Sequence, residues 1–432
     1  MYNRRLRAWG LALFLMAVTL STPGCGLGLV PPTPTPEPVK LRFAFIKNVA
    51  DYTPLANQFQ KLHPGLTVDL VPIDTFRDGG LRDVDMRDDI DVVRWGQDYL
   101  SAERREKVLP LDEIMVSDAS FPHADILKGS LEALQYRGTQ LGIPAGLNFV
   151  VAYYNAPRFK ATGTPPPSLD WTLDDLLAAA VAVHSTEGAD SQADFTYGLC
   201  VDPESGDPAY FAYLFGGGLF DRMPDPSHST LNDPANVKAL QWYADLHLRY
   251  DVVPDPDRIG ILFPRGRLYE AITRGKCGLW FGAYADRGGR MWPFEWQAEG
   301  VMLPLPRANA PFGVIYVDGY YVLAQSKHRR EAWEWTRFLL DYQEAAGLML
   351  PPLQSQARSA QYADRVGKDV AAVAQRLPAE AIIMPTDPDP ALGRVMEVYL
   401  EAVAKVAKGD IDAETALNEA QAEVGTSFGA RE

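Results

Sequence analysis

Short apolar runs alternate with amphipathic stretches over the first part of the chain. Residues 41–46 and 66–71 are apolar runs typical of buried strands. Between them, residues 51–63 place apolar side chains at the spacing of an amphipathic helix, which Pro64 and Gly65 should end. Residues 91–95 predict a third strand. This order indicates parallel βαβ units and an open α/β sheet.

A second α/β pattern follows a long apolar strand. A fourth strand should begin within 140–144, and a strand over 149–155 precedes a proline-rich interruption. The later periodicity predicts helices over 173–184, 231–250, 331–342 and 389–408, and strands over 197–201, 277–281, 301–306 and 314–324. No segment repeats at a spacing of 20–50 residues, which excludes solenoids and propellers.

Length and charge narrow the class of protein. The chain has 432 residues, enough for two domains of ordinary size, and its 47% hydrophobic and 22% charged residues are typical of a globular protein. The formal net charge is −15, and no basic stripe interrupts the acidic balance. Such a chain repels phosphate backbones, so we expect no nucleic-acid partner.

The N-terminus carries a targeting signal. Three arginines precede an apolar run of about twelve residues from Trp9 to Leu20, which is too short to span a bilayer. Small residues then lead to Cys25, as in a bacterial lipoprotein signal over 1–25 whose cysteine is acylated. Five prolines make 26–39 an extended tether. The alternative is an ordinary signal peptide, cleaved near a coincidental cysteine.

The sequence alone does not show whether the other two cysteines pair with each other. Cys200 and Cys277 each lie in an apolar run that reads as a buried strand. In an oxidising compartment they could form a disulfide, or they could remain small buried thiols.

Motifs for catalysis and metal binding are missing from the sequence. It has no phosphate-binding GxxxxGK[ST] loop, no HExxH and no GxSxG. The aspartates at 83–91 lack the spacing of a calcium loop, and the six histidines are scattered. We therefore expect no catalytic residues, no metal and no cofactor, although two distant carboxylates of a glycosidase would leave no local motif.

Aromatic residues instead stand beside polar residues near predicted strand ends. In open α/β sheets, ligands bind at these ends. Aromatic rings that stack on C–H surfaces, beside Asp and Asn acceptors, suit a sugar. For any one aromatic, a place in the core is the commoner outcome. The candidate ligand contacts are Trp95, Asp98, Tyr99, Asn148, Tyr210, Tyr284, Asp318 and Tyr320.

Several segments in order resemble one family, the extracellular solute-binding proteins of family 1, which include maltose-binding components of ABC importers. The segments are Leu55-Ala56-Asn57-Gln58-Phe59 with His63-Pro64-Gly65, Asp91-Val92-Val93, Gly142-Ile143-Pro144 with Tyr153-Tyr154-Asn155, Arg274 to Leu279, and Glu331-Ala332-Trp333-Glu334-Trp335. Each is weak alone, but their order extends over most of the mature chain.

The resemblance implies two α/β lobes of the periplasmic-binding-protein type, joined by a hinge that the chain crosses more than once. One lobe would comprise 40–150 and 304–348, the other 151–303 and 349–432. By position, Trp95, Asp98 and Tyr99 would contact the ligand from the first lobe, and Asn148 would bind it at the crossover. Tyr284 and Tyr210 fall where the family has stacking aromatics. The maltose-binding branch of the family has Glu where Asn148 stands, so the resemblance favours a neutral polyol other than maltose.

The same resemblance implies a function without catalysis. The closed form, stabilised by ligand between the lobes, would deliver a sugar or oligosaccharide to ABC permease subunits. The protein would act as a monomer outside the cytoplasm, held at the membrane by its lipid alone. A secreted carbohydrate-active enzyme and a binding protein for a peptide, polyamine or metal are the alternatives.

Overall fold

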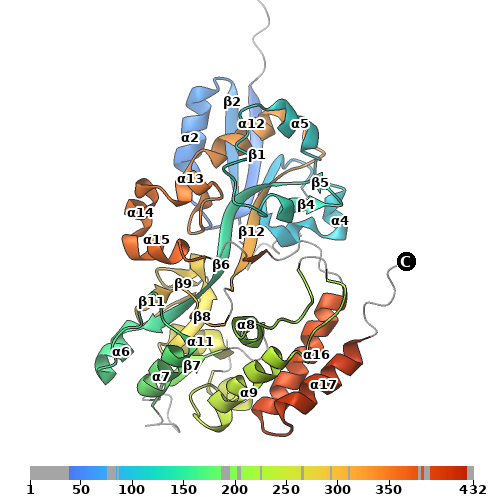
Figure 1. Cartoon of the computed structure of the whole chain (residues 1–432). Helices are drawn as coiled ribbons and strands as arrows, with labels where there is room; N and C mark the ends of the chain where they lie inside the picture. The colour runs from blue at the N-terminus through green and yellow to red at the C-terminus, as the bar shows by residue number, and fades with distance from the viewer. Residues whose placement is uncertain are drawn as a thin grey trace, which may run out of the picture. The chain divides into compact units, whose positions relative to one another are not determined.

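One sheet of nine strands organises the described part of the chain (Figure 1). The order of seven strands in space is β2-β1-β3-β12-β6-β8-β7, with β11 paired to β6 and β13 paired to β12. The strands are β1 (Val39–Ile46), β2 (Leu66–Ile73), β3 (Val92–Gly96), β6 (Ile143–Asn155), β7 (Tyr197–Cys200), β8 (Cys277–Ala283), β11 (Gly300–Leu303), β12 (Val314–Val322) and β13 (Ile382–Ile383).

This structure is a computed structural model. It describes residues 38–425, apart from 75–83, 85–86, 186–194, 202–205, 224–225, 264–266, 292–293, 310–311, 378–380 and 384–389. The predicted signal segment, Cys25 and the tether up to residue 37 lie outside the described residues.

Strand direction differs in part from the parallel sheet that the sequence predicts. β1 runs parallel to β2 and β3, and β7 runs parallel to β8, as expected. The strands in the middle are antiparallel instead: β12 to β3 and β6, and β6 to β8 and β11. The prediction is wrong there because β6 and β12 carry the chain from one half of the sheet to the other, with no βαβ crossover between them.

Helices pack on both faces of the sheet. The longer ones are α2 (Thr53–Leu62), α7 (Leu173–Val183), α9 (Pro234–Leu248), α12 (Arg329–Leu340), α16 (Pro390–Ala407) and α17 (Ala413–Val424). The shorter ones are α4 (Ala102–Arg105), α5 (Asp112–Ser117), α6 (Ala156–Thr162), α8 (Asp207–Leu214), α10 (Pro256–Leu262), α11 (Arg267–Thr273), α13 (Gln354–Ala357), α14 (Ala360–Val366) and α15 (Lys368–Ala374). Single 3-10 turns are η1 (Gln97–Leu100), η2 (Glu132–Leu134), η3 (Tyr284–Asp286) and η4 (Gln343–Ala346), and two small hairpins pair β4 (Gln135–Tyr136) with β5 (Thr139–Gln140) and β9 (Arg290–Met291) with β10 (Phe294–Glu295).

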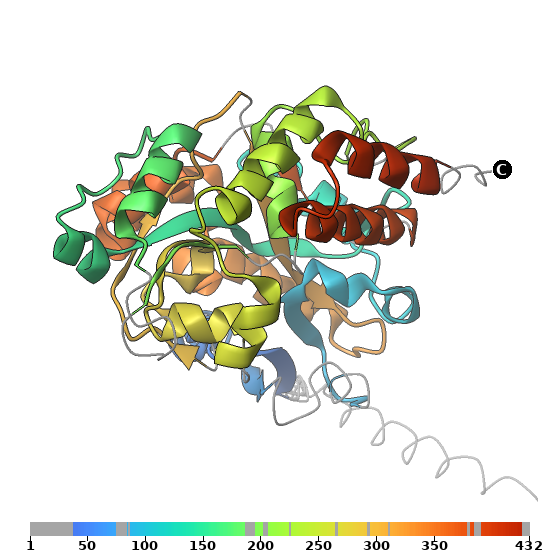
Figure 2. The same cartoon turned by 90° about the horizontal axis from the view of Figure 1, so that it is seen from below.

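The ends of the predicted helices have local causes. Thr172 and Asp175 form a reciprocal capping box at the start of α7. At the start of α9, the Asp233 side chain accepts from the Ala235 N–H, and Pro234 occupies the first turn. In α16, the apolar stripe of the sequence is buried against α9 and α17, which lie beside it in Figure 2. These predicted helices are confirmed to within a few residues.

Three hydrophobic clusters divide the interior. The first core joins β1 to α2 and α12 through residues such as Phe43, Phe59 and Trp335. The second core joins β6 and β8 to α7, α8, α9, α16 and α17 through residues such as Leu176, Phe281 and Val403. The shared core includes residues from both halves of the sheet, among them Val93, Phe149 and Trp280.

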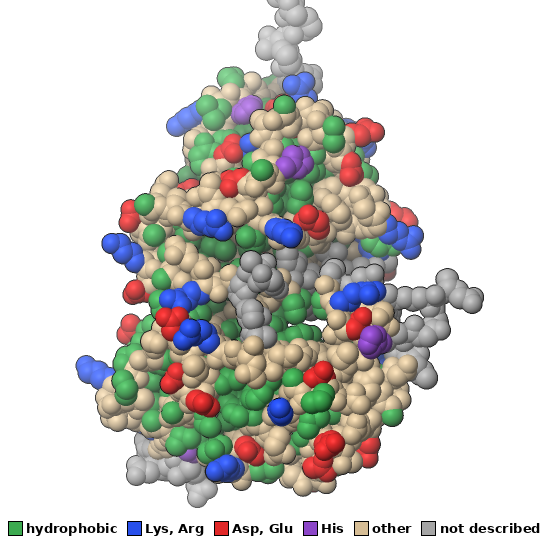
Figure 3. All heavy atoms as spheres, in the orientation of Figure 1, with side chains coloured by type: hydrophobic (Ala, Val, Ile, Leu, Met, Phe, Trp, Pro, Cys, Tyr) green, Lys and Arg blue, Asp and Glu red, His purple; other side chains and the backbone are tan. Residues whose placement is uncertain are grey.

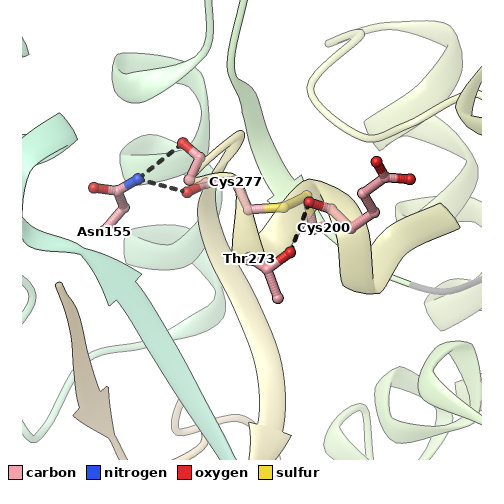
Figure 4. The surroundings of a disulfide bond; sticks show 6 residues. Asn155, Cys200, Thr273 and Cys277 are labelled. Carbon is pink, nitrogen blue, oxygen red and sulfur yellow. Dashed lines mark hydrogen bonds between the residues drawn. A yellow bond between two sulfur atoms is a disulfide. The ribbon is translucent and has the colours of Figure 1, made fainter. Parts of the chain in front are cut away.

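Cys200 and Cys277 form a disulfide between β7 and β8 (Figure 4). The Asn155 amide donates to the carbonyls of Gly275 and Cys277 at 3.1 and 3.2 Å, which fixes the start of β8 against β6. Both cysteines are buried in the shared core. The pairing that the sequence left open is therefore a disulfide, across a sequence separation of 77 residues.

Candidate functional site

A polar strip interrupts the apolar packing on one face of the sheet. Along β12, side chains two residues apart share a face. Tyr320 lies in the first core and Val314 in the second core, so Asp318 and Tyr316 stand between the two cores. Asn148 of β6 is in register with Tyr316. We call Asn148, Tyr316 and Asp318 the polar strip.

Tyr316 is the exposed member of this strip. Its relative exposure is 44%, whereas every other residue of β12 is buried. The sheet face therefore presents an aromatic ring to solvent at the place where the two halves of the sheet meet. An exposed tyrosine within a buried strand can offer both a stacking surface and a hydroxyl to a ligand.

Tyr210 reaches the polar strip from α8. Its hydroxyl lies close enough to that of Tyr316 for each tyrosine to shift the pKa of the other. Phe281 and Phe312 hold the Tyr210 ring, with centroids at 6.0 and 5.9 Å. Burial of Tyr210 and the partial burial of Tyr316, each with a contribution from Asp207, raise the pKa of both tyrosines. Their hydroxyls are therefore protonated at neutral pH and can donate to a neutral acceptor.

Asn148 is oriented by the neighbouring chain. Its side-chain oxygen accepts from the Ala285 N–H at 3.0 Å, just beyond the end of β8. The amide nitrogen then points away from that contact as a donor. The structure thus brings three of the sequence-predicted residues, Asn148, Tyr210 and Asp318, to one region of the sheet.

A buried arginine supports the strip at its Asp318 end. Arg94 of β3 is fully buried, and its Nε donates to Asp318 Oδ2 at 3.3 Å. Its Nη1 and Nη2 donate to the carbonyls of Ala345 and Ala346 at 2.6 and 3.1 Å. Burial works against the charge, but neighbouring Tyr52 and Asp318 raise the pKa of the guanidinium above its usual value. Burial also raises the pKa of Asp318, which the guanidinium partly offsets.

Tyr320 belongs to this support. It is buried in the first core, and its hydroxyl lies 3.4 Å from that of Tyr52, which the Arg94 guanidinium also contacts. The structure therefore places Tyr320 beside the strip on the same face of the sheet, among core residues. Asp98 lies nearby and is exposed; a Cβ on Gly96 would meet the carboxylates of both Asp98 and Asp318.

Three other predicted contacts lie in the shared core. Trp95 has a relative exposure of 7%, and Tyr284 has 0%. The Tyr284 ring stacks on Phe149 at 4.6 Å, and its hydroxyl lies 2.6 Å from that of Tyr362 in α14. Tyr99 is buried and stacks on Tyr321. The structure does not bring these three rings to the polar strip, and their contact with the ligand stays a prediction.

The sequence reasoning missed Tyr316 and Asp207. A signal for Tyr316 was available, because alternation along the predicted strand 314–324 puts it on the same face as Asp318 and Tyr320. Asp207 carried no such signal; it gains its place because α8 brings its first turn toward β12.

The described residues hold neither a metal-ligating cluster nor a membrane-spanning helix. Among the described residues, no group of three or more His, Cys, Asp or Glu side chains could hold a metal ion. Within the same residues, none of the helices has the length and apolar character needed to cross a bilayer. On the face in Figure 3, the described acidic and basic side chains are interspersed.

The family comparison decides the class. The model of the bacterial extracellular solute-binding protein family matches residues 46–346, well over half of the chain. The chain belongs to that family. As a solute-binding protein of this family it is extracytoplasmic, and the resemblance seen in the sequence is confirmed.

Solved structures agree on the two-lobed fold. An ABC substrate-binding protein from Listeria monocytogenes in complex with cycloalternan has 19% identity and a TM-score of 0.68, over 91% of this chain and 99% of that one. The cyclic α-maltosyl-1,6-maltose binding protein from Arthrobacter globiformis has 18% identity and a TM-score of 0.66, over 90% and 99%. Maltose-bound MalE3 of T. maritima has 14% identity and a TM-score of 0.62, over 90% and 99%.

Proposed function

We propose that this solute-binding protein captures a sugar or oligosaccharide for an ABC importer. The observation that carries the proposal is the polar strip, where Tyr316 and Tyr210 meet beside Asn148. Rings with protonated hydroxyls, an oriented amide and a carboxylate match the alternating C–H and hydroxyl surfaces of a neutral sugar. The sugars and sugar-derived ligands named for similar structures support the same class.

Each member of the site has a role in this proposal. Tyr316 and Tyr210 stack on the sugar ring or hydrogen-bond to it, Asn148 donates through its amide, and Asp318 and Asp98 accept from sugar hydroxyls. Arg94 does not touch the ligand; it holds Asp318 in place. Trp95, Tyr99 and Tyr284 contribute as ligand contacts only if closure of the lobes exposes them to the ligand.

The sheet suggests how the lobes divide. We propose that one lobe comprises 40–150 with 304–348 and the other 151–303 with 349–432, so that β6 passes from one to the other at its midpoint. A ligand bound to both lobes favours the closed form by its difference in affinity for the two states. The protein then docks on permease subunits and carries out no catalysis itself.

The N-terminal segment supplies the proposed anchor. Cys25, at the end of the apolar run, would be lipidated, and residues 26–39 would tether the folded part to the membrane. A tether raises the effective concentration of the protein near its permease. We expect a monomer with no nucleic-acid partner.

The test measures affinity in variants of the strip. Tyr210→Ala and Tyr316→Ala should each weaken binding of a sugar ligand by about 5- to 150-fold, as for loss of one stacking ring. Tyr136→Ala, a half-buried tyrosine on the β4–β5 hairpin, is the matched control and should bind normally. Titration calorimetry with maltotetraose, mannotriose and ribitol supplies the readout. Equal affinity in all three variants would place the ligand elsewhere.

The alternatives predict other outcomes. A carbohydrate-active enzyme would shorten maltotetraose over time, which chromatography of the mixture detects. A peptide- or polyamine-binding protein would bind those solutes and none of the sugars.

A further inference from the structure

The sheet has a gap beside β6, between the places where β11 and β12 pair with it. Leu303 at the end of β11 pairs with Ala152, and Ile315 near the start of β12 pairs with Phe149, on the same edge of β6. Val150 and Val151 therefore have no strand beside them on this edge, because residues 304–313 leave the sheet between β11 and β12. A cavity of about 470 Å³ lies at this gap.

The walls of the cavity are mostly apolar. They come from β6, from the segment that joins β11 to β12, and from the end of α15 with the residues after it. The apolar lining residues are Phe149, Val150, Val151, Leu169, Leu305, Phe312, Val373 and Leu377, together with prolines 304 and 306. This volume falls within the range of small-molecule sites, and the cavity is distinct from the polar strip.

The charged lining residues are both arginines. Arg307 and Arg376 line the cavity, and no described acidic side chain lines it with them. Arg376 forms an ion pair with Asp170, whereas Arg307 donates its Nε to the Asp170 backbone carbonyl at 3.2 Å. Both guanidiniums are exposed, and only that of Arg376 is paired with the Asp170 carboxylate, in a chain whose net charge is −15. The Nη groups of Arg307 have no described carboxylate partner and can bind an anion.

We propose that this cavity, the gap pocket, binds a small amphipathic carboxylate, with an apolar body against β6 and its anionic head on Arg307 and Arg376. Guanidinium groups pair with carboxylates through two parallel hydrogen bonds, which favours this head group over a neutral hydroxyl. The proposal does not depend on the sugar site, and it is tested with no sugar present.

Phe312 connects the gap pocket to the sugar-binding region. Its ring stacks on Tyr213 at 4.9 Å and lies 5.9 Å from Tyr210. On the other side of β6, Phe149 of the same pocket stacks on Tyr284. An occupant of the gap pocket therefore contacts residues that pack directly against predicted sugar contacts.

The probe is octanoate, compared with octan-1-ol and octylammonium, on the ligand-free protein. We expect octanoate to bind at least about tenfold more tightly than octan-1-ol, and octylammonium to bind most weakly. The Arg307→Gln/Arg376→Gln variant should lose this preference. Arg358→Gln, an exposed arginine outside the pocket, is the matched control and should keep it. Ala308→Trp should fill the pocket and block all three probes.

Ligand-detected NMR and calorimetry measure these affinities. No binding of octanoate up to about 10 mM would overturn the proposal. So would equal affinity of octanoate for the wild type and the double arginine variant, because the head group would then lie elsewhere. If Ala308→Trp does not fold, the arginine variants alone decide the result.

Discussion

Arg94 offers the sharpest test of how the site is supported. It is fully buried, and one guanidinium contacts Asp318, Tyr52 and the carbonyls of η4. Arg94→Met keeps most of the volume of the side chain but removes every donor. The Asp318 carboxylate and the carbonyls of Ala345 and Ala346 would then be buried without this partner.

The expected loss of stability follows from these contacts. Removing one partner of a buried ion pair costs about 3–5 kcal/mol. For the folded unit of residues 39–432, the entropy of unfolding near the midpoint is about 0.8 kcal/mol per degree, so Tm should fall by about 4–6 °C. Arg358→Met, at an exposed arginine, should leave Tm unchanged.

A double variant separates the charge from the packing. Asp318→Asn in the Arg94→Met background removes the unpaired carboxylate, and should restore part of the lost stability. Differential scanning calorimetry of the four proteins of this cycle gives the coupling between the two side chains. A Tm for Arg94→Met within about 1 °C of the wild type would refute the reasoning, because no network of this kind could then be present.

Three further predictions concern the disulfide, a half-buried acid and the anchor. The Cys200→Ala/Cys277→Ala variant should lose about 4.5 kcal/mol of unfolding free energy, since the bond closes a loop with a sequence separation of 77. Urea denaturation of the oxidised wild type and of the variant measures the difference, and equal midpoints would contradict it. Burial raises the pKa of Asp286 from 3.8 to about 6, so its contribution to stability is greatest below pH 4 and falls as the pH rises to about 6. Asp286→Asn should therefore stabilise the protein by about 1–3 kcal/mol at pH 8 and by little at pH 4. A gain that is independent of pH would argue against a raised pKa at this half-buried carboxylate. Metabolic labelling with a palmitate analogue should mark the wild type but not Cys25→Ser, and equal labelling of both would remove the proposed anchor.

Local patterns in the sequence predict the elements well. Residues 41–46, 51–63 and 66–71 match β1, α2 and β2 to within two residues, because their periodicity and the Pro64-Gly65 break are local signals. The direction of β12 could not be read in this way. It depends on where the chain crosses between the halves of the sheet, which no local pattern encodes.

Exposure is the harder prediction for the candidate site. Tyr284 comes three residues after the predicted strand 277–281, and Tyr316 lies within the predicted strand 314–324. Both are tyrosines near apolar runs, yet Tyr284 is buried and Tyr316 is exposed. Tyr362, from a helix 78 residues further along the chain, covers the Tyr284 hydroxyl. The disulfide is a similar case, since Cys200 and Cys277 come together only because β7 pairs with β8.

The class of the bound solute is the central claim, and one measurement tests it directly. Protein freed of ligand by unfolding and refolding is mixed with equal amounts of maltotetraose, mannotriose, ribitol, a tripeptide and spermidine, and native mass spectrometry identifies what it retains. The account predicts one intact sugar or sugar alcohol per chain, and loss of that species in the Tyr210→Ala/Tyr316→Ala variant. Retention of the tripeptide or spermidine, or of none of the three carbohydrates, would contradict it.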